Sequence, residues 1–274
     1  MNTFKQLGLI ALVAMTMLSC SSLTDLTAGL TAGAPGVEKG AFSVSANTKV
    51  FFAKGNLQYQ ASTNTWRFAE NQWDYIGDAN SRISDDNEDW IDLFGWGTGN
   101  APFKYKNLYW EDYKSFNDWG KNTIINGEDY NWFTLSQDEW NYIFETRKTS
   151  SGILYAKAIV NGVNGLILLP DSWSTFGYPL NEPNKEDASF GSNRISQKVW
   201  TEKLEANGAI FLPAAGYRNE KDVIKAGTSG YYWKCTGSGP ANSRSVIFGD
   251  GFVYWDQREN IHQGFSVRLA RTIE

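Results

Sequence analysis

The sequence predicts one α+β domain that is rich in short antiparallel strands and contains two capped helices. Apolar and polar side chains alternate near both ends of the chain, which is typical of half-buried strands. Two segments in the middle begin with helix-capping residues. Strand-rich sequence with only two helices favours an α+β fold over a parallel βαβ fold. We expect this domain to cover residues 41–274, because no linker-like composition interrupts the chain after residue 40.

The domain is expected to open with short antiparallel strands between residues 42 and 68. Two turn-forming stretches, Gly55–Asn56 and Ser62–Asn64, interrupt the alternation and divide the strands from one another. The apolar positions that alternate with polar neighbours are Phe42, Val44, Val50, Phe52, Leu57, Tyr59, Trp66 and Phe68.

Two helices are expected from their start signals. In the first, Ser136 stands three residues before Glu139, which is the capping-box pattern, and Trp140 occupies a hydrophobic staple position. The second starts with the same order of residue types around Ser196 and ends before Gly208, which suits the left-handed position that follows a helix. The side chains expected on one face of the first helix are Trp140, Ile143, Phe144 and Arg147.

The remaining elements are expected to be strands. Each helix is followed by a strand that ends in Leu-Pro, at residues 166–170 and 209–213. The C-terminal part of the chain then alternates again, which predicts further strands with one buried face. The alternating apolar positions are Tyr231, Trp233, Val246, Phe248, Val253, Trp255, Phe265, Val267 and Leu269.

The N-terminus has the pattern of a signal peptide. Lys5 precedes about a dozen mostly apolar residues, which end at a Met-Leu-Ser-Cys sequence over residues 17–20. This sequence resembles the lipobox of bacterial lipoproteins, although that family usually has Leu where Met17 stands. We expect residues 1–19 to be removed, Cys20 to carry lipid, and residues 20–40 to form a flexible tether. An ordinary secretory signal with an accidental cysteine is the alternative.

These features predict a protein of the bacterial cell envelope that the lipid on Cys20 anchors in a membrane. No stretch supplies the roughly 18 consecutive apolar residues that a spanning helix needs. Ser21 follows the cysteine, with no Asp there, which by analogy with known lipoproteins favours transport to the outer membrane and exposure at the surface.

Composition excludes several function classes. The net charge is −5 and the pI about 5.1, with Lys and Arg scattered among the acids, so we expect no nucleic-acid partner. If Cys20 is lipidated, Cys235 is left as a free thiol without a disulfide partner. The single histidine, His262, leaves no second imidazole for a zinc site, and we expect it in a solvated loop.

No motif specifies a cofactor, a metal or a catalytic set. Asp85–Asp89 has the alternating oxygen ligands of a calcium loop, but Trp90 and Trp96 stand where an EF-hand needs Gly and Glu. Gly95–Gly99 lacks the strand-to-helix context of a dinucleotide-binding loop, and no Gly-x-Ser-x-Gly elbow occurs. We therefore expect no catalytic residue and no cofactor.

Six segments together resemble a known family: Gly55–Tyr59, Trp90–Gly97, Leu135–Trp140, Phe211–Arg218, Gly230–Trp233 and Gly264–Arg271. They look like the "major paralogous domain" surface lipoproteins of anaerobic bacteria, which are similar to the formylglycine-generating-enzyme (FGE-sulfatase) branch of the C-type-lectin-like fold. The resemblance implies a twisted antiparallel core, two helices and long loops that carry the binding surface. That enzyme branch uses two active-site cysteines, whereas Cys235 has no partner, so the resemblance does not extend to the activity.

The same resemblance places a binding surface late in the chain. Aromatic residues make up 15% of the chain, and some are expected to stand exposed as platforms for sugars or proteins. The alternative is that Val253 and Trp255 face the core and that Asp256 and Arg258 form a surface ion pair. The expected ligand-binding residues are Trp233, Tyr254, Trp255, Asp256, Arg258 and Asn260.

The favoured functional hypothesis is a non-catalytic surface module that binds a glycan or a surface protein. A structural or accessory subunit of a fimbria or surface layer is the second hypothesis, and an enzyme of the formylglycine-generating type is the third.

Overall fold

The computed structural model describes residues 40–102, 116–128, 131–175, 177–236 and 243–273. The described part is strand-rich with few helices, which confirms the predicted α+β class. Within it, no helix is long and apolar enough to cross a membrane. The predicted signal peptide, Cys20 and the tether up to residue 39 lie outside the described residues.

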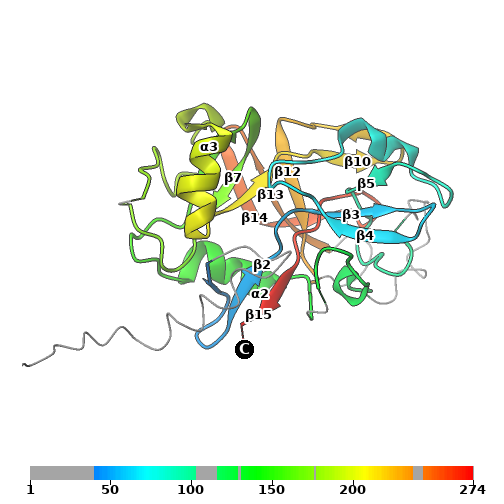
Figure 1. The fold of residues 1–274 in the computed structure, drawn as a ribbon, viewed down its shortest axis with the longest axis horizontal. Helices are drawn as coiled ribbons and strands as arrows, with labels where there is room; N and C mark the ends of the chain where they lie inside the picture. The colour runs from blue at the N-terminus through cyan, green and yellow to red at the C-terminus, as the bar shows by residue number, and fades with distance from the viewer. Residues whose placement is uncertain (1–39, 103–115, 129–130, 176, 237–242, 274) are drawn as a thin grey trace, which may run out of the picture.

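Strands follow one another at both ends of the described chain, β1 to β4 and β9 to β15, and the short helical elements lie between these two groups (Figure 1). The strands are β1 (Phe42–Ser43), β2 (Lys49–Phe52), β3 (Leu57–Gln60), β4 (Thr65–Phe68), β5 (Trp90–Ile91), β6 (Tyr155–Val160), β7 (Val163–Leu168), β8 (Arg194–Ile195), β9 (Ile210–Pro213), β10 (Tyr217–Asn219), β11 (Asp222–Ile224), β12 (Ser229–Trp233), β13 (Ser243–Gly249), β14 (Phe252–Glu259) and β15 (Ala270–Thr272). The helical elements are η1 (Gly77–Arg82), η3 (Trp119–Lys121), α2 (Gln137–Asn141), η4 (Tyr142–Thr146), η5 (Phe190–Ser192), α3 (Gln197–Val199), η6 (Trp200–Leu204) and η7 (Glu205–Asn207).

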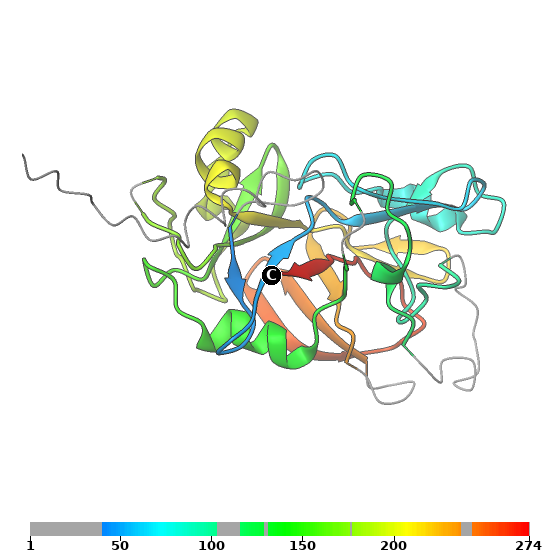
Figure 2. The same cartoon turned by 60° about the horizontal axis from the view of Figure 1, so that its bottom comes forward.

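The described strands form five small sheets, with the orders β1-β2-β15, β4-β3-β5, β8-β6-β7-β9, β10-β11 and β12-β13-β14. Their pairs are antiparallel, except for the parallel pair of β6 and β8. The two strands predicted to end in Leu-Pro, β7 and β9, pair with each other in one sheet. The β3–β4 hairpin lies at one end of the molecule and α3 at the other (Figures 1 and 2).

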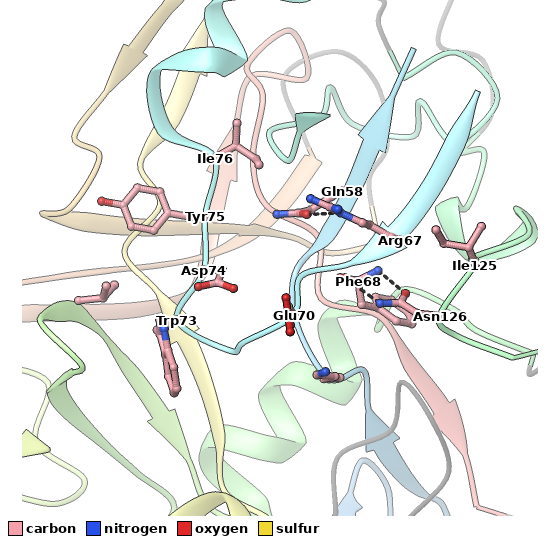
Figure 3. Close-up of a pocket in the computed structure, with 12 residues that line it drawn as sticks. Gln58, Arg67, Phe68, Glu70, Trp73, Asp74, Tyr75, Ile76, Ile125 and Asn126 are labelled. Carbon is pink, nitrogen blue, oxygen red and sulfur yellow. Dashed lines mark hydrogen bonds between the residues drawn. The ribbon is translucent and has the colours of Figure 1, made fainter. Parts of the chain in front are cut away.

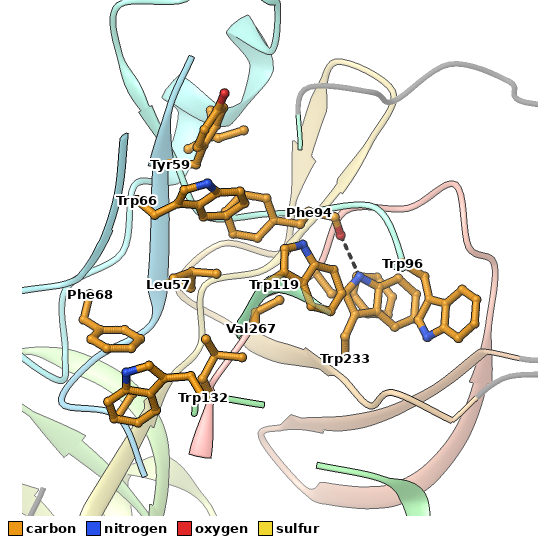
Figure 4. Close-up of a cluster of buried hydrophobic side chains, with 14 of the residues drawn as sticks. Leu57, Tyr59, Trp66, Phe68, Phe94, Trp96, Trp119, Trp132, Trp233 and Val267 are labelled. Atoms are coloured by element: carbon orange, nitrogen blue, oxygen red, sulfur yellow. Dashed lines mark hydrogen bonds between the residues drawn. The ribbon is translucent and has the colours of Figure 1, made fainter. Parts of the chain in front are cut away.

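Three hydrophobic clusters form the interior. The first cluster lies under the β3–β4 hairpin and includes Trp66, Phe94 and Trp119 (Figure 4). The β12-β13-β14 sheet separates it from the second cluster, because Trp233 of β12 packs into the first and its neighbour Tyr232 into the second. Since successive side chains of a strand point to opposite faces, one strand can serve two clusters.

The β8-β6-β7-β9 sheet separates the second cluster from the third in the same way. Leu166 of β7 and Leu212 of β9 pack into the second cluster, whereas Ile167 and Phe211 pack into the third. Both faces of the β8-β6-β7-β9 sheet are therefore covered, which explains why most residues of β7 and β9 are apolar.

The first predicted helix is α2 followed by η4. The Ser136 hydroxyl accepts a hydrogen bond from the Glu139 amide at 3.3 Å, and the Glu139 carboxylate accepts one from the Ser136 amide at 2.7 Å, so the capping box is confirmed. Trp140 is 1% exposed and packs on Phe52 and Phe144. After one α-helical turn the segment continues as a π-helix, which the sequence analysis did not predict.

The second predicted helix is the run α3, η6 and η7. The Ser196 hydroxyl accepts a hydrogen bond from the Val199 amide at 3.3 Å, and Gly208 ends the run in the left-handed conformation with φ 84°. Both predicted ends are therefore confirmed.

The segment from Gly264 to Leu269 differs from the predicted strand with one buried face. All six of its residues are buried, and it pairs with its neighbours through isolated bridges, such as Phe94 to Phe265 and Tyr232 to Ser266, and not as a regular strand. Arg268 crosses this region and donates hydrogen bonds to the Ala53 and Phe211 carbonyls at 3.0 and 2.7 Å. The segment is covered on both sides, so its polar side chains are buried with the apolar ones.

Candidate functional site

The predicted ligand-binding residues lie mainly on β14, the edge strand of the β12-β13-β14 sheet. Tyr254, Asp256 and Arg258 are exposed, whereas the residues between them are partly buried, because side chains alternate along a strand. Tyr254 is 49% exposed. Asn260 follows the strand and is also exposed. The structure therefore brings four of the six predicted residues to one exposed surface, which we call the β14 surface.

The ion pair on the β14 surface is not the pair between Asp256 and Arg258 that the sequence offered as an alternative. Asp256 forms an ion pair with Arg244 of β13, with 3.0 Å between Nη1 and Oδ1, and not with Arg258. Arg244 and Arg258 stand directly opposite each other in the two strands, so Asp256 offsets a repulsion between like charges. Arg258 has no ion pair within the described part of the chain.

Trp255 has a structural role. Its ring stacks on Phe144 of η4 with centroids 5.3 Å apart, and its Nε1 donates a hydrogen bond to the Glu145 carboxylate at 2.8 Å. Its carbonyl accepts a hydrogen bond from Lys234 Nζ. Burial lowers the pKa of Lys234 to about 8, although the nearby Asp256 acts in the opposite direction. Trp255 therefore attaches η4 to the sheet that carries the β14 surface.

Trp233 lies in the first cluster and is only 1% exposed. Its Nε1 donates a hydrogen bond to the Phe94 carbonyl at 2.6 Å (Figure 4). Its ring stacks on Phe265 with centroids 4.1 Å apart. A ligand at the surface cannot reach this indole without displacing core side chains. Its predicted place among the ligand-binding residues is therefore corrected. The alternating pattern predicted a strand but did not show that both faces of that strand are buried.

Cys235 is a free thiol and half-buried. Burial raises the pKa of this thiol to about 11, and the carboxylates of Asp118 and Glu139 act in the same direction. A thiol with such a pKa is a poor nucleophile near neutral pH, because the thiolate is the reactive form. Across the residues that the structure describes, no group of three or more His, Cys, Asp and Glu side chains is placed to hold a metal ion.

A cavity of about 650 Å³, which the sequence did not predict, lies on other elements (Figure 3). It is lined by side chains of the β3–β4 hairpin, of the segment from Glu70 to Ile76, and of Asn126 and Val163. The outward positions of β3 and β4 could be read from the alternation that places Leu57 and Trp66 in the core. Nothing in the sequence indicates that the other segments meet these strands.

The comparisons with known proteins match part of the chain to one family model. Residues 182–270 match a domain of unknown function, DUF8237, and this range includes β12, β13 and β14. No curated protein and no solved structure matches the chain.

Proposed function

We propose that this protein is a non-catalytic binding protein of the bacterial cell surface that engages a glycan or a surface protein through the β14 surface. The observation that carries the proposal is the joint exposure of Tyr254, Asp256 and Arg258 on one face of a hydrogen-bonded strand, with Asn260 beside them. Planar rings cover apolar faces of a ligand, while carboxylate, guanidinium and amide groups satisfy its polar groups.

The β14 surface is held in place by the packing beneath it. Tyr254 stacks on Phe252 with centroids 5.1 Å apart, and Phe252 itself packs against the first cluster. The Trp255 contact with η4 holds the same strand from its other face. Side chains that are ordered before binding lose less conformational entropy when a ligand arrives, which favours affinity.

The test is a glycan and surface-protein array probed with the purified full chain and with the combined variant Tyr254→Ala, Asp256→Ala, Arg258→Ala. We expect the variant to stay folded, because each side chain is exposed, and to lose at least about tenfold in affinity for any partner found, equivalent to about 1.4 kcal/mol. The matched control is Lys198→Ala with Glu202→Ala, which removes two exposed charges near α3.

Three other outcomes would redirect the proposal. Full binding by the folded triple variant would remove the β14 surface from consideration. Saturable binding only to further copies of the same chain would favour a structural subunit of a fimbria or surface layer. Oxidation of a cysteine-containing peptide that disappears in Cys235→Ser would favour the enzyme hypothesis.

We also propose that the chain is held at the outer membrane by lipid on Cys20. The signal pattern and the lipobox-like residues support this assignment. The Cys20→Ser variant should be soluble or held in the export pathway, and it should carry no labelled fatty acid. The wild-type protein should be degraded when intact cells are treated with protease. A Cys20→Ser protein that still carried labelled fatty acid and fractionated with membranes would contradict the anchor.

The fold relationship that we propose is with the C-type-lectin-like proteins, in the formylglycine-generating-enzyme branch. A strand-rich α+β domain with two N-capped helices and a buried C-terminal Gly264–Arg268 segment supports this relationship. The relationship concerns the fold alone, because fold does not imply activity.

A further inference from the structure

The cavity of about 650 Å³ beside the β3–β4 hairpin falls within the roughly 300–1,000 Å³ that is usual for sites of small ligands. Its floor is the outer face of β3 and β4, where Gln58 and Arg67 stand opposite each other in the strand register. Glu70 and Asp74 approach from the segment that follows β4 (Figure 3). Val163, at the start of β7, also lines the cavity. None of these residues belongs to the β14 surface.

Arg67 is held in one position by two contacts. Its guanidinium lies over the Trp90 ring, with 3.7 Å from Cζ to the centroid, and its Nε donates a hydrogen bond to Gln58 Oε1 at 2.8 Å. These contacts leave both terminal nitrogens of the guanidinium without a hydrogen bond to any described residue. Arg67 therefore offers two oriented donors at the wall of the cavity.

Two carboxylates face the same space without pairing with Arg67. Glu70 and Asp74 are close enough to raise the pKa of Arg67, against the larger lowering by burial, yet neither forms an ion pair with it in the described structure. Asp74 Oδ2 accepts hydrogen bonds from the Asn71 backbone and side-chain nitrogens, both at 3.0 Å, and its Oδ1 has no partner among the described residues. The opposite charges are thus separated by open space.

Gln58 adds a neutral donor. Its side chain is 3% exposed, and its oxygen is occupied by Arg67. Figure 3 shows the carboxamide nitrogen on the side away from Arg67, and no described residue accepts a hydrogen bond from it. The carboxamide nitrogen can therefore donate a hydrogen bond to a ligand in the cavity.

Two isoleucines, Ile76 and Ile125, stand at the rim of the cavity on segments that hydrogen bonds hold in place. Asn126 closes one side by hydrogen bonds in both directions with the backbone of Phe68, at 2.8 and 3.0 Å. This attachment presents its neighbour Ile125, which is 67% exposed, at the cavity edge. On the opposite side, Ile76 is fixed through its amide, which donates to Asp92 at 2.9 Å.

We propose that this cavity binds a neutral, polyhydroxylated ligand, specifically a short neutral oligosaccharide. Sugar hydroxyls donate and accept hydrogen bonds, so one ring can bridge the separated Arg67 guanidinium and the Glu70 and Asp74 carboxylates. Apolar carbon faces of the oligosaccharide rings would rest against Ile76 on one side of the cavity and Ile125 on the other. The charges of Lys54, Arg67, Glu70 and Asp74 sum to zero (+2 − 2), so the cavity favours neither an anion nor a cation.

The experiment uses the full chain and the double variant Glu70→Gln with Asp74→Asn, which removes both carboxylate charges with little change in volume. The matched control is Asp85→Asn with Glu88→Gln, which makes the same change in net charge in an exposed acidic loop. Binding is measured by isothermal titration calorimetry with a set of short neutral oligosaccharides, which includes maltotriose, cellotriose, mannotriose and triacetylchitotriose. Inorganic phosphate and tetralysine are the charged probes.

We expect saturable binding of at least one neutral oligosaccharide, a loss of at least about tenfold in the cavity variant, and unchanged affinity in the control. The Gln58→Leu variant, with its melting temperature measured to confirm folding, should bind the same sugar more weakly. Binding of phosphate or tetralysine instead of sugars would overturn the proposal, and so would an absence of binding to every sugar. Equal sugar affinity in a folded cavity variant would also overturn it. The triple variant of the β14 surface should keep this affinity, so failure of one site is distinguishable from failure of the other.

Discussion

Replacement of Asp92 by asparagine should remove a pH-dependent loss of stability from this protein. Asp92 is fully buried next to β5. Its carboxylate accepts hydrogen bonds from Asn80 Nδ2 at 2.8 Å and from the Ile76 amide at 2.9 Å. Burial raises the pKa of this carboxyl from 3.8 to about 6, because the hydrogen bonds only partly compensate for lost hydration of the charge.

The sign of the effect follows from the raised pKa. Below about pH 4 the carboxyl is protonated in both the folded and the unfolded chain, so it makes no pH-dependent contribution to the free energy of unfolding. Between about pH 4 and pH 6 the unfolded chain releases the proton while the folded chain retains it, and stability falls as pH rises. A shift of about 2 units corresponds to a loss on the order of 3 kcal/mol above pH 6.

The assay is urea denaturation of the native protein and of Asp92→Asn at a series of pH values across this window. The variant should gain stability relative to the native protein as pH rises, by an amount on the order of 3 kcal/mol in total. If the side-chain amide of the new asparagine faces the Ile76 N–H, two donors meet and the free energy of unfolding falls by an amount that does not depend on pH. Only the pH-dependent difference in the free energy of unfolding therefore tests the effect of burial on Asp92. Asp78→Asn, which removes an exposed carboxylate from η1, is the matched control for the loss of one charge. A difference between native and variant that stays constant with pH, or that changes in the opposite direction, would refute the dominance of burial.

Two further predictions concern the α2 region. Ser136→Ala should lower the free energy of unfolding by about 1 kcal/mol through loss of the cap. Trp140→Ala should lower it by about 3 to 5 kcal/mol because it leaves a cavity in the core. Denaturation measures both changes, and an unchanged melting temperature for the Trp140 variant would contradict the packing of this side chain. Trp140→Phe is the milder comparison, because the indole Nε1 has no hydrogen-bond partner in the described structure. In the Cys20→Ser background, Cys235 should react with iodoacetamide at pH 8 more than about tenfold more slowly than a free cysteine, given its raised pKa; mass spectrometry follows the reaction, and a rate equal to that of free cysteine would show that the thiol is not buried.

Local features of the fold could be predicted because the interacting residues are near one another in sequence. The Ser136 cap and its Glu139 partner are three residues apart, so their reciprocal hydrogen bonds depend on one turn of chain. The strand positions between Phe42 and Phe68 followed from alternation, which needs only a knowledge of which side chains avoid water. The exposure of Tyr254, Asp256 and Arg258 followed from the same alternation.

The sequence by itself determined the α+β class, the starts of both helices and the face of β14 that meets solvent, since these depend on neighbouring residues. Only the tertiary structure decided that Trp233 is enclosed on both sides, because the coverage comes from Phe94 and Phe265, far away in the chain. It also brought Arg67 and Asp74 to one cavity with Val163. Contacts between distant segments depend on how sheets stack around shared hydrophobic clusters, and neither the spacing nor the type of residue within one segment specifies that arrangement.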